Sequence, residues 1–210
     1  MAYQDPYSTR DEIKTYLRID LALTDYDDDI DDVGLSATRE INNHCSRNFN
    51  RDGALDAATT RIFRVKRSGL ARVHDFYTTT DLVIKTDPTG TGVFSDTWSA
   101  ADYQLEPLNG IRDGNPGWPY FVIRSVGAMS FPALYPIASL QVTAHFGWAA
   151  VPADVKQAHL MLCAETFKMR EAPLGVAGWS EFGVVRVRDV PKVAKLLYPY
   201  ELDRVKIATG

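Results

Sequence analysis

The sequence lacks the marks of disulfide-built, secreted and membrane-spanning proteins. Its 210 residues include only two cysteines, Cys45 and Cys163, too few for a disulfide scaffold. We expect both to be buried and reduced, because each lies on an apolar face of a predicted helix. No apolar run approaches the roughly 20 residues that a membrane-spanning helix needs, so we expect no membrane partner. Residues 1–12 carry neither a basic start nor an apolar stretch, and we therefore expect no signal peptide.

An excess of positive charge is also missing. Lysine and arginine number 23 against 27 aspartate and glutamate residues, which gives a formal net charge of -4. A protein of this charge is not expected to hold DNA by neutralising its phosphates. With 45% hydrophobic and 24% charged residues, the composition is that of a folded globular protein.

No motif indicates a nucleophile, a phosphate loop or a metal site. A Gly-x-Ser-x-Gly nucleophile elbow does not occur. Gly90-Thr91-Gly92 follows Asp87-Pro88 between strand-like stretches, so we interpret it as a hairpin turn and not as a phosphate loop. We expect no metal and no cofactor, and we expect His159 to be a core residue. The four histidines have no metal-ligand spacing among themselves or with the cysteines: His44, His74, His145 and His159.

The acidic run at 25–32 resembles a calcium loop only in part. An EF-hand register that starts at Asp29 puts Gly34 at the sixth position and Glu40 at the twelfth. The fifth position is Val33, which offers no side-chain oxygen, and the following residues continue a helical pattern. We interpret the run as the charged start of a helix that faces solvent or an aqueous channel.

Apolar periodicity predicts helices near both ends of the chain. Thr9 and Glu12 form a capping-box pattern that begins a short helix, and a second helix runs from about residue 25 or 26 to Arg47. The longest pattern predicts a core helix from about Pro152 to Arg170 that is covered on most sides. A last short helix is predicted over 190–198.

The middle of the chain has the two-residue period of β-strands. β-branched residues are frequent there, and turn residues such as Asn109-Gly110 separate the apolar stretches. Many short strands with close turns predict an antiparallel sheet or a small sandwich. The predicted strands are Thr60–Val65, Ala71–Asp75, Leu82–Thr86, Val93–Trp98, Tyr103–Glu106, Tyr120–Val126 and Leu140–Trp148.

This order of elements predicts an α+β protein, a helical bundle formed from both chain ends with an inserted antiparallel β domain. We expect 1–57 and 149–198 to form the bundle, and 58–148 to form the insert. Residues 199–210 are expected to form a C-terminal tail that docks on a neighbour or on its own domain. The tail keeps more apolar side chains than a merely solvated segment usually has: Leu202, Val205 and Ile207.

Aromatic and acidic residues leave two further possibilities open. Aromatic side chains concentrate at protein interfaces, so Trp118 and Trp179 are candidates for contact surfaces. Trp179 is the better one because glycines flank its loop, whereas Trp148 follows a strand and is expected in the core. Three carboxylates in the β block would make a glycosidase site only if they met in space, and solvated positions are the default: Asp96, Asp102 and Glu106.

Four stretches carry a resemblance to a known family. Ile13–Asp20 reads IKTYLRID, and the second predicted helix ends in ATREINNHCSRNF at 37–49. The β block closes with FGW at 146–148, followed by VP and VKQA from 151. The central helix leads into REAPLGV at 170–176, and LLYPY follows at 196–200. In this order the stretches resemble the head-to-tail connector family of long-tailed bacteriophages, also called adaptor or head-completion proteins.

This resemblance implies a virion structural protein and not an enzyme. Copies would form a ring, commonly a dodecamer, below the portal protein, and the ring would extend the DNA channel. Its other side would meet the next neck protein, a stopper, or the tail, while DNA passes through without sequence-specific binding. The protein would be made in the host cytoplasm and would end in the virion neck, at the head-tail junction.

The resemblance also suggests two contact regions. The C-terminal tail is expected to dock on the portal, through Tyr198, Tyr200, Leu202, Arg204, Val205 and Ile207. The segment FGVVRV at 182–187 resembles the family's loop after the central helix. It is expected to face a neighbouring subunit or the channel, through Trp179, Phe182, Arg186 and Arg188.

Two other functions remain open from the sequence alone. Within virion proteins, the alternative is a stopper or tail-completion protein of the neck. Outside them, the alternative is a β-domain hydrolase or carbohydrate-binding module with helical flanks.

Overall fold

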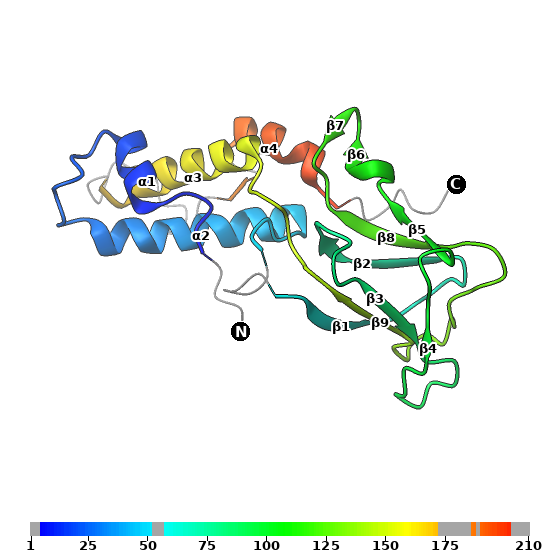
Figure 1. The fold of residues 1–210 in the computed structure, drawn as a ribbon. Coiled ribbons are helices and arrows are strands. Elements are labelled where there is room, and N and C mark those ends of the chain that lie inside the picture. The colour runs from blue at the N-terminus through cyan, green and yellow to red at the C-terminus, as the bar shows by residue number, and fades with distance from the viewer. Residues whose placement is uncertain (1–4, 52–56, 172–185, 188–189, 203–210) are drawn as a thin grey trace. The chain divides into compact units, whose positions relative to one another are not determined.

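The structure is a computed structural model that describes residues 5–51, 57–171, 186–187 and 190–202. The chain divides into two compact units, one that combines Tyr3–Phe49 with Val151–Gly210, and one that comprises Asn50–Ala150. We call them the helical unit and the β unit. The sequence predicted the boundaries between the bundle and the insert at 57/58 and 148/149. The protein is α+β, with an antiparallel β insert between helices from both ends of the chain (Figure 1).

The helical unit contains four α-helices among its described residues. They are α1 (Arg10–Leu17), α2 (Asp27–Cys45), α3 (Ala153–Glu171) and α4 (Pro191–Leu197). The predicted capping box is confirmed, since the Thr9 amide donates to Glu12 Oε2 at 2.9 Å and the Glu12 amide donates to Thr9 Oγ1 at 3.3 Å. Pro152 lies just before α3 instead of inside its first turn, and its carbonyl accepts the Lys156 amide at 3.0 Å.

Helix α3 is the core helix that its apolar pattern predicts. It packs against α1, α2 and α4, which explains why apolar residues cover most of its circumference. Its fully buried side chains include Val155, Leu162 and Cys163. Cys45 lies at the end of α2, and both cysteines are buried and free. Burial raises the pKa of each thiol to about 12, so neither is reactive at neutral pH.

The β unit is built from antiparallel strand pairs in two sheets and a hairpin. The first sheet has the order β1 (Thr59–Phe63), β9 (Leu140–Ala144), β3 (Val83–Thr86), β4 (Asp96–Thr97). The second has the order β2 (Leu70–Phe76), β8 (Tyr120–Ser125), β5 (Tyr103–Glu106). One apolar core takes side chains from both sheets, including Phe76, Ile84, Ile123, Val142 and Phe146.

Five of the predicted strands are longer than the strands that form, two of them by four residues, and one hairpin was not predicted. Only Asp96–Thr97 of the expected strand 93–98 pairs, because the preceding residues belong to the connection from β3. Strand β9 ends at Ala144, and Gly147 follows with a φ of +103°, which is outside strand geometry. The connection between the expected strands 103–106 and 120–126 contains the two-residue strands β6 (Ile111–Arg112) and β7 (Asn115–Pro116).

Among the described residues, no helix combines the length and the apolarity that spanning a bilayer would require.

Candidate functional site

The described start of the expected docking tail is attached to the helical unit. Tyr198–Tyr200 forms a 3-10 turn directly after α4. The ring of Tyr200 lies edge-on to that of Phe49, with ring centroids 5.7 Å apart. The Leu202 amide donates to the Cys45 carbonyl at 2.9 Å, which satisfies an acceptor at the end of α2. Tyr200 and Leu202 therefore stabilise the helical unit itself.

Tyr198 differs from these two residues. Tyr198 is 70% exposed, whereas Glu201 contacts His44, with 2.9 Å between Glu201 Oε1 and His44 Nε2. Of the expected tail contacts that the structure describes, Tyr198 presents the most open aromatic surface. Arg204, Val205 and Ile207 lie outside the described residues.

The expected contact loop is described at only two positions. Arg186 is exposed, and Val187 beside it is fully buried. The Val187 amide donates to Glu40 Oε1 at 3.1 Å, which attaches this point of the chain to α2. Trp179, Phe182 and Arg188 lie outside the described residues.

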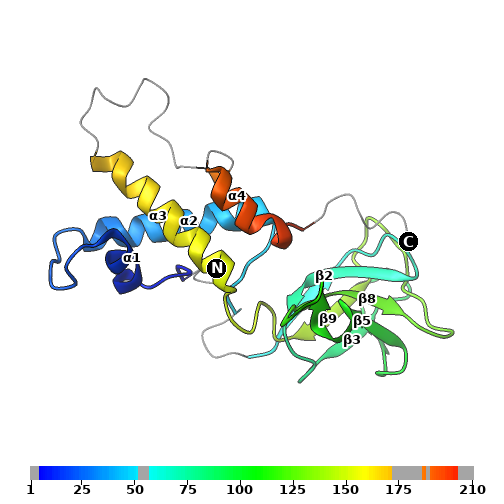
Figure 2. The same ribbon diagram turned by 90° about the horizontal axis from the view of Figure 1, so that it is seen from above.

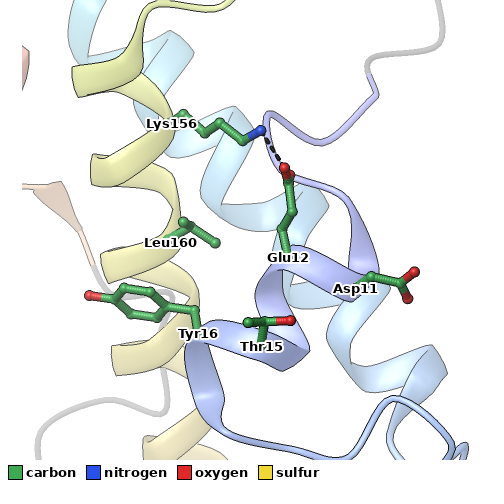
Figure 3. Close-up of a pocket in the computed structure, with 6 residues that line it drawn as sticks. All are labelled: Asp11, Glu12, Thr15, Tyr16, Lys156 and Leu160. Carbon is green, nitrogen blue, oxygen red and sulfur yellow. Dashed lines mark hydrogen bonds and ion pairs between the residues drawn. The ribbon is translucent and has the colours of Figure 1, made fainter.

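A groove of about 350 Å³ lies between α1 and α3 (Figure 3). Its apolar surface comes mainly from Tyr16 on α1 and Leu160 on α3, and Leu160 lies between Lys156 and Tyr16 in the view. Lys156 crosses to α1 and donates to Glu12 Oε1 at 2.5 Å, and this pair lowers the pKa of the Glu12 carboxyl. The groove is a mixed apolar and charged surface of the kind that protein contacts use.

A buried lysine holds the connection between α1 and α2. The side chain of Lys14 is 2% exposed and pairs with the carboxylate of Asp27. Its ammonium group also donates to the Leu23 carbonyl at 2.7 Å and to the Leu21 carbonyl at 3.4 Å. Pairing with Lys14 lowers the pKa of the Asp27 carboxyl. The connection presents Leu21 and Leu23 to solvent although its backbone is held in place.

Part of the acidic run at 25–32 forms ion pairs within the helical unit and is not a free surface. Arg10 donates to Asp27 at 3.0 Å and also pairs with Asp31. These two carboxylates therefore serve the packing of α1 on α2. Asp28 and Asp32 remain exposed, as the interpretation of a charged helix start expects.

His159 is the core histidine that the sequence predicts. Its Nε2 lies 2.9 Å from the Gly34 carbonyl, and its Nδ1 lies 3.1 Å from Ser8 Oγ. Because a carbonyl can only accept, Nε2 carries the proton and Nδ1 accepts from the serine hydroxyl. The neutral ring thus links α3 to α2 and to the segment before α1. Burial lowers its pKa from 6.5 to about 4.

This buried ring predicts a pH effect on stability. The folded state resists protonation of His159 between pH 6.5 and 4, whereas the unfolded state does not, so stability is lost as the pH falls through this window. In the His159→Gln protein, the loss in the free energy of unfolding over this pH range should be smaller by up to about 3 kcal/mol. Urea unfolding at pH 7 and pH 4.5 measures the difference. Equal pH dependence of the two proteins would contradict the assignment.

The carboxylates considered for a glycosidase site have separate local partners. Asp96 lies on β4 of the first sheet and accepts from Ser95 Oγ at 2.8 Å. Asp102 accepts from the Ser99 hydroxyl and from the Ser99 amide, each at 2.7 Å, and these hydrogen bonds lower the pKa of its carboxyl. Glu106 on β5 of the second sheet pairs with Arg124 at 2.6 Å. Nothing in these contacts resembles a pair of carboxylates that faces a shared cleft.

The glycine-containing segment after β3 is the predicted hairpin turn. It is organised by Asp87, whose carboxylate accepts from the amides of Thr89, Gly90 and Gly92 at 2.6–3.0 Å. Burial alone would raise the pKa of Asp87, but these amide donors hold it below its usual value. The carboxylate thereby fixes the connection from β3 to β4.

The remaining histidines and tryptophans also have structural partners. His145 pairs with Asp81 at 3.2 Å, and His74 contacts Arg61 at 2.6 Å. In the described parts of the chain, no three His, Cys, Asp or Glu side chains are grouped so as to hold a metal ion. Trp148 is core, as expected. The suggestion that Trp118 marks a contact surface is wrong, because it is 8% exposed and packs 5.1 Å from Trp148 between ring centroids.

Comparisons with known proteins bear on the fold. No family model and no curated protein matches the sequence. A solved structure described as the neck of an empty GTA (gene transfer agent) particle, computed with C6 symmetry, contains a similar chain with a TM-score of 0.56 and 19% identity. The match covers 95% of this chain and 91% of the other.

Two further structures show weaker similarity. A chain of the native GTA virion has a TM-score of 0.50 and 20% identity, over 95% of this chain and 91% of the other. A chain in the neck of the native GTA particle, computed with C12 symmetry, has a TM-score of 0.48 and 18% identity, over 98% and 97%. The first two matches show that this protein has a fold also found in GTA particles, including the GTA neck.

Proposed function

We propose that this protein is a structural component of a virion neck, and more specifically a head-to-tail adaptor. The observation that supports the proposal is the similarity to a chain of a GTA neck over 95% of this chain, which includes both the helical flanks and the β insert. The resemblance of the sequence motifs to head-to-tail connectors is an independent argument for the same role. The protein would act in the virion at the head-tail junction.

In this proposal, identical copies form a closed ring below the portal. The similar GTA neck was computed with C6 symmetry, which is compatible with a ring of six or twelve copies. Copies that repeat one head-to-tail contact form a closed ring when the rotations between neighbours add up to a full turn. The ring would extend the DNA channel, and a chain with a net charge of -4 is suited to a conduit that does not retain DNA.

A structural role also agrees with the chemistry of the described residues. The four histidines have separate partners, and the carboxylates of the β unit are used in local hydrogen bonds or ion pairs. The two cysteines are buried with raised pKa values. These side chains stabilise the two units, which is what a subunit of an assembly requires.

The decisive experiment is electron microscopy of the protein mixed with portal rings from the virus or prophage that encodes it. We expect a second ring on the portal, with one layer of this protein in direct contact. Density that appears only after another neck protein is added would favour a stopper or tail-completion role instead. Portal rings without added density under all conditions would contradict a neck function.

We further propose that the C-terminal tail docks on the portal, and the structure sets where to truncate it. A chain that ends after Leu202 keeps the Leu202–Cys45 and Tyr200–Phe49 contacts, so its melting temperature should not change. Its affinity for portal rings should fall by at least about tenfold. A chain that ends after Pro199 is the control, because it should lose stability as well. Unchanged portal affinity of the first truncation would refute the docking role.

A further inference from the structure

The α1 side of the helical unit combines an open groove with exposed apolar side chains. Tyr16 lines the groove and is 42% exposed, and Leu21 in the following connection is 53% exposed. Leu23 is also exposed, and the lysine beneath these residues holds their backbone in place. Exposed apolar side chains on a backbone that is already held in place favour a contact site, because little order has to be gained on binding. We call this surface the α1 face.

The α1 face is strongly acidic. Residues 9–32 contain nine acidic and three basic side chains. Arg10 and Lys14 pair with Asp27 and Asp31, so these charges cancel, and Arg18 is exposed; the remaining acidic side chains still outnumber it. Asp11 lines the groove and is exposed, as are Asp28 and Asp32 on α2. A partner for this face must offer positive charge together with an apolar or aromatic side chain.

Helix α4 offers this combination. Lys192 and Lys195 are three residues apart, so they lie on one side of the helix, and both are exposed. Tyr198 follows directly and is 70% exposed. Neither lysine has an ion pair within the part of the chain that the structure describes. We call this surface the α4 face.

The two faces lie on different sides of the same unit. Helix α3 contacts both α1 and α4, and Figure 2 shows α1 and α4 on opposite sides of α3. A molecule with two complementary but different faces binds copies of itself head to tail, which is the type of contact that closes rings. A twofold contact would instead require one face that is complementary to itself.

We propose that the α4 face of one copy docks on the α1 face of the next, with Lys192 and Lys195 against the acidic side chains and Tyr198 toward the apolar groove. The proposal rests on the proposed ring and names its subunit contact; it assigns Tyr198 to this contact and leaves portal docking to the tail after Leu202. Opposite charges across the contact orient the copies and make the association depend on salt.

Cysteine cross-linking tests the contact, because both native thiols are buried and unreactive. The full-length Tyr16→Cys and Lys195→Cys proteins are oxidised separately and as a mixture, with and without portal rings. We expect the yield of disulfide-linked dimer to be several-fold higher in the mixture than in either protein alone. In about 0.5 M salt this yield should be lower. Thr79→Cys on the β unit, mixed with either protein, serves as the collision control.

Charge reversal then tests the pairing itself. Lys192→Glu in the Lys195→Cys protein and Asp11→Lys in the Tyr16→Cys protein should each lower the dimer yield, and the two together should restore it. The contact would be overturned if dimers formed mainly between two copies of the same cysteine variant, or if the yield only equalled that of the Thr79→Cys control. It would also be overturned if the two charge reversals together did not restore the dimer yield. If electron microscopy still shows rings on the portal in that case, the neck function stands and only the interface is wrong.

Discussion

Replacing Gly147→Ala should unfold or severely destabilise the β unit. Gly147 has a φ of +103°, and a Cβ atom there would lie 2.2 Å from the Asn50 carbonyl oxygen and 2.8 Å from the Arg51 Cα. These are backbone atoms, so no side-chain rotation relieves the collision. Together with the unfavourable φ, we expect a loss of more than about 3 kcal/mol. Urea unfolding followed by tryptophan fluorescence measures it, because Trp148 is the next residue.

Gly127→Ala is the matched control for this substitution. Gly127 also has a positive φ, +68°, but a Cβ atom there would meet nothing within 4 Å. The expected loss is that of the backbone conformation alone, about 1–2 kcal/mol. The difference between the two variants isolates the close approach of the chain at Asn50. Equal losses would show that the region around Asn50 moves aside easily.

The second large effect is expected from Lys14→Met. The substitution leaves the Leu21 and Leu23 carbonyls without their ammonium donor and removes the lysine partner of Asp27. We expect a loss of about 3 kcal/mol in the free energy of unfolding, which is the lower range for breaking a buried pair, because Asp27 is partly exposed and keeps Arg10. Faster proteolysis within 20–24 should accompany it, since this connection loses its anchor.

Lys156→Met is the control for this prediction. Lys156 also pairs with a carboxylate across two helices, but both side chains are about 40% exposed. Solvent and salt screen such a pair, so its loss should cost less than about 1 kcal/mol. Unfolding at pH 7 distinguishes the two lysines. A similar loss in both variants would mean that the burial of Lys14 does not matter.

Local signals explain how much of the fold was predictable. The Thr9–Glu12 capping box, the apolar pattern of α3 and the turn residues around the strands all depend on neighbours in sequence, and each led to the observed element. The hairpin β6–β7 was missed because two-residue strands are too short to show a period. Strand β9 was predicted too long because its alternation continues to Phe146, which forms an isolated bridge with Phe76 instead of extending the strand.

The candidate site was less predictable, because it depends on contacts distant in sequence. Lys14 on an amphipathic helix is expected to be exposed, and only the position of the following connection makes it buried. The partners of His159 lie 125 and 151 residues away, so its role as a core residue was predictable but its tautomer was not. The charges that distinguish the α1 face from the α4 face are visible in the sequence. Their placement on opposite sides of α3 is not.

The attachment of Leu202 to Cys45 has a mechanical consequence. A pull on the C-terminal end would first load the Leu202–Cys45 hydrogen bond and the adjacent Glu201–His44 pair. From there tension would enter the end of α2, a 19-residue helix packed along α3, without having to pass through the short helix α4. A subunit tethered by its tail would thus pass part of the load to α2, one of its two longest helices, for as long as this contact holds.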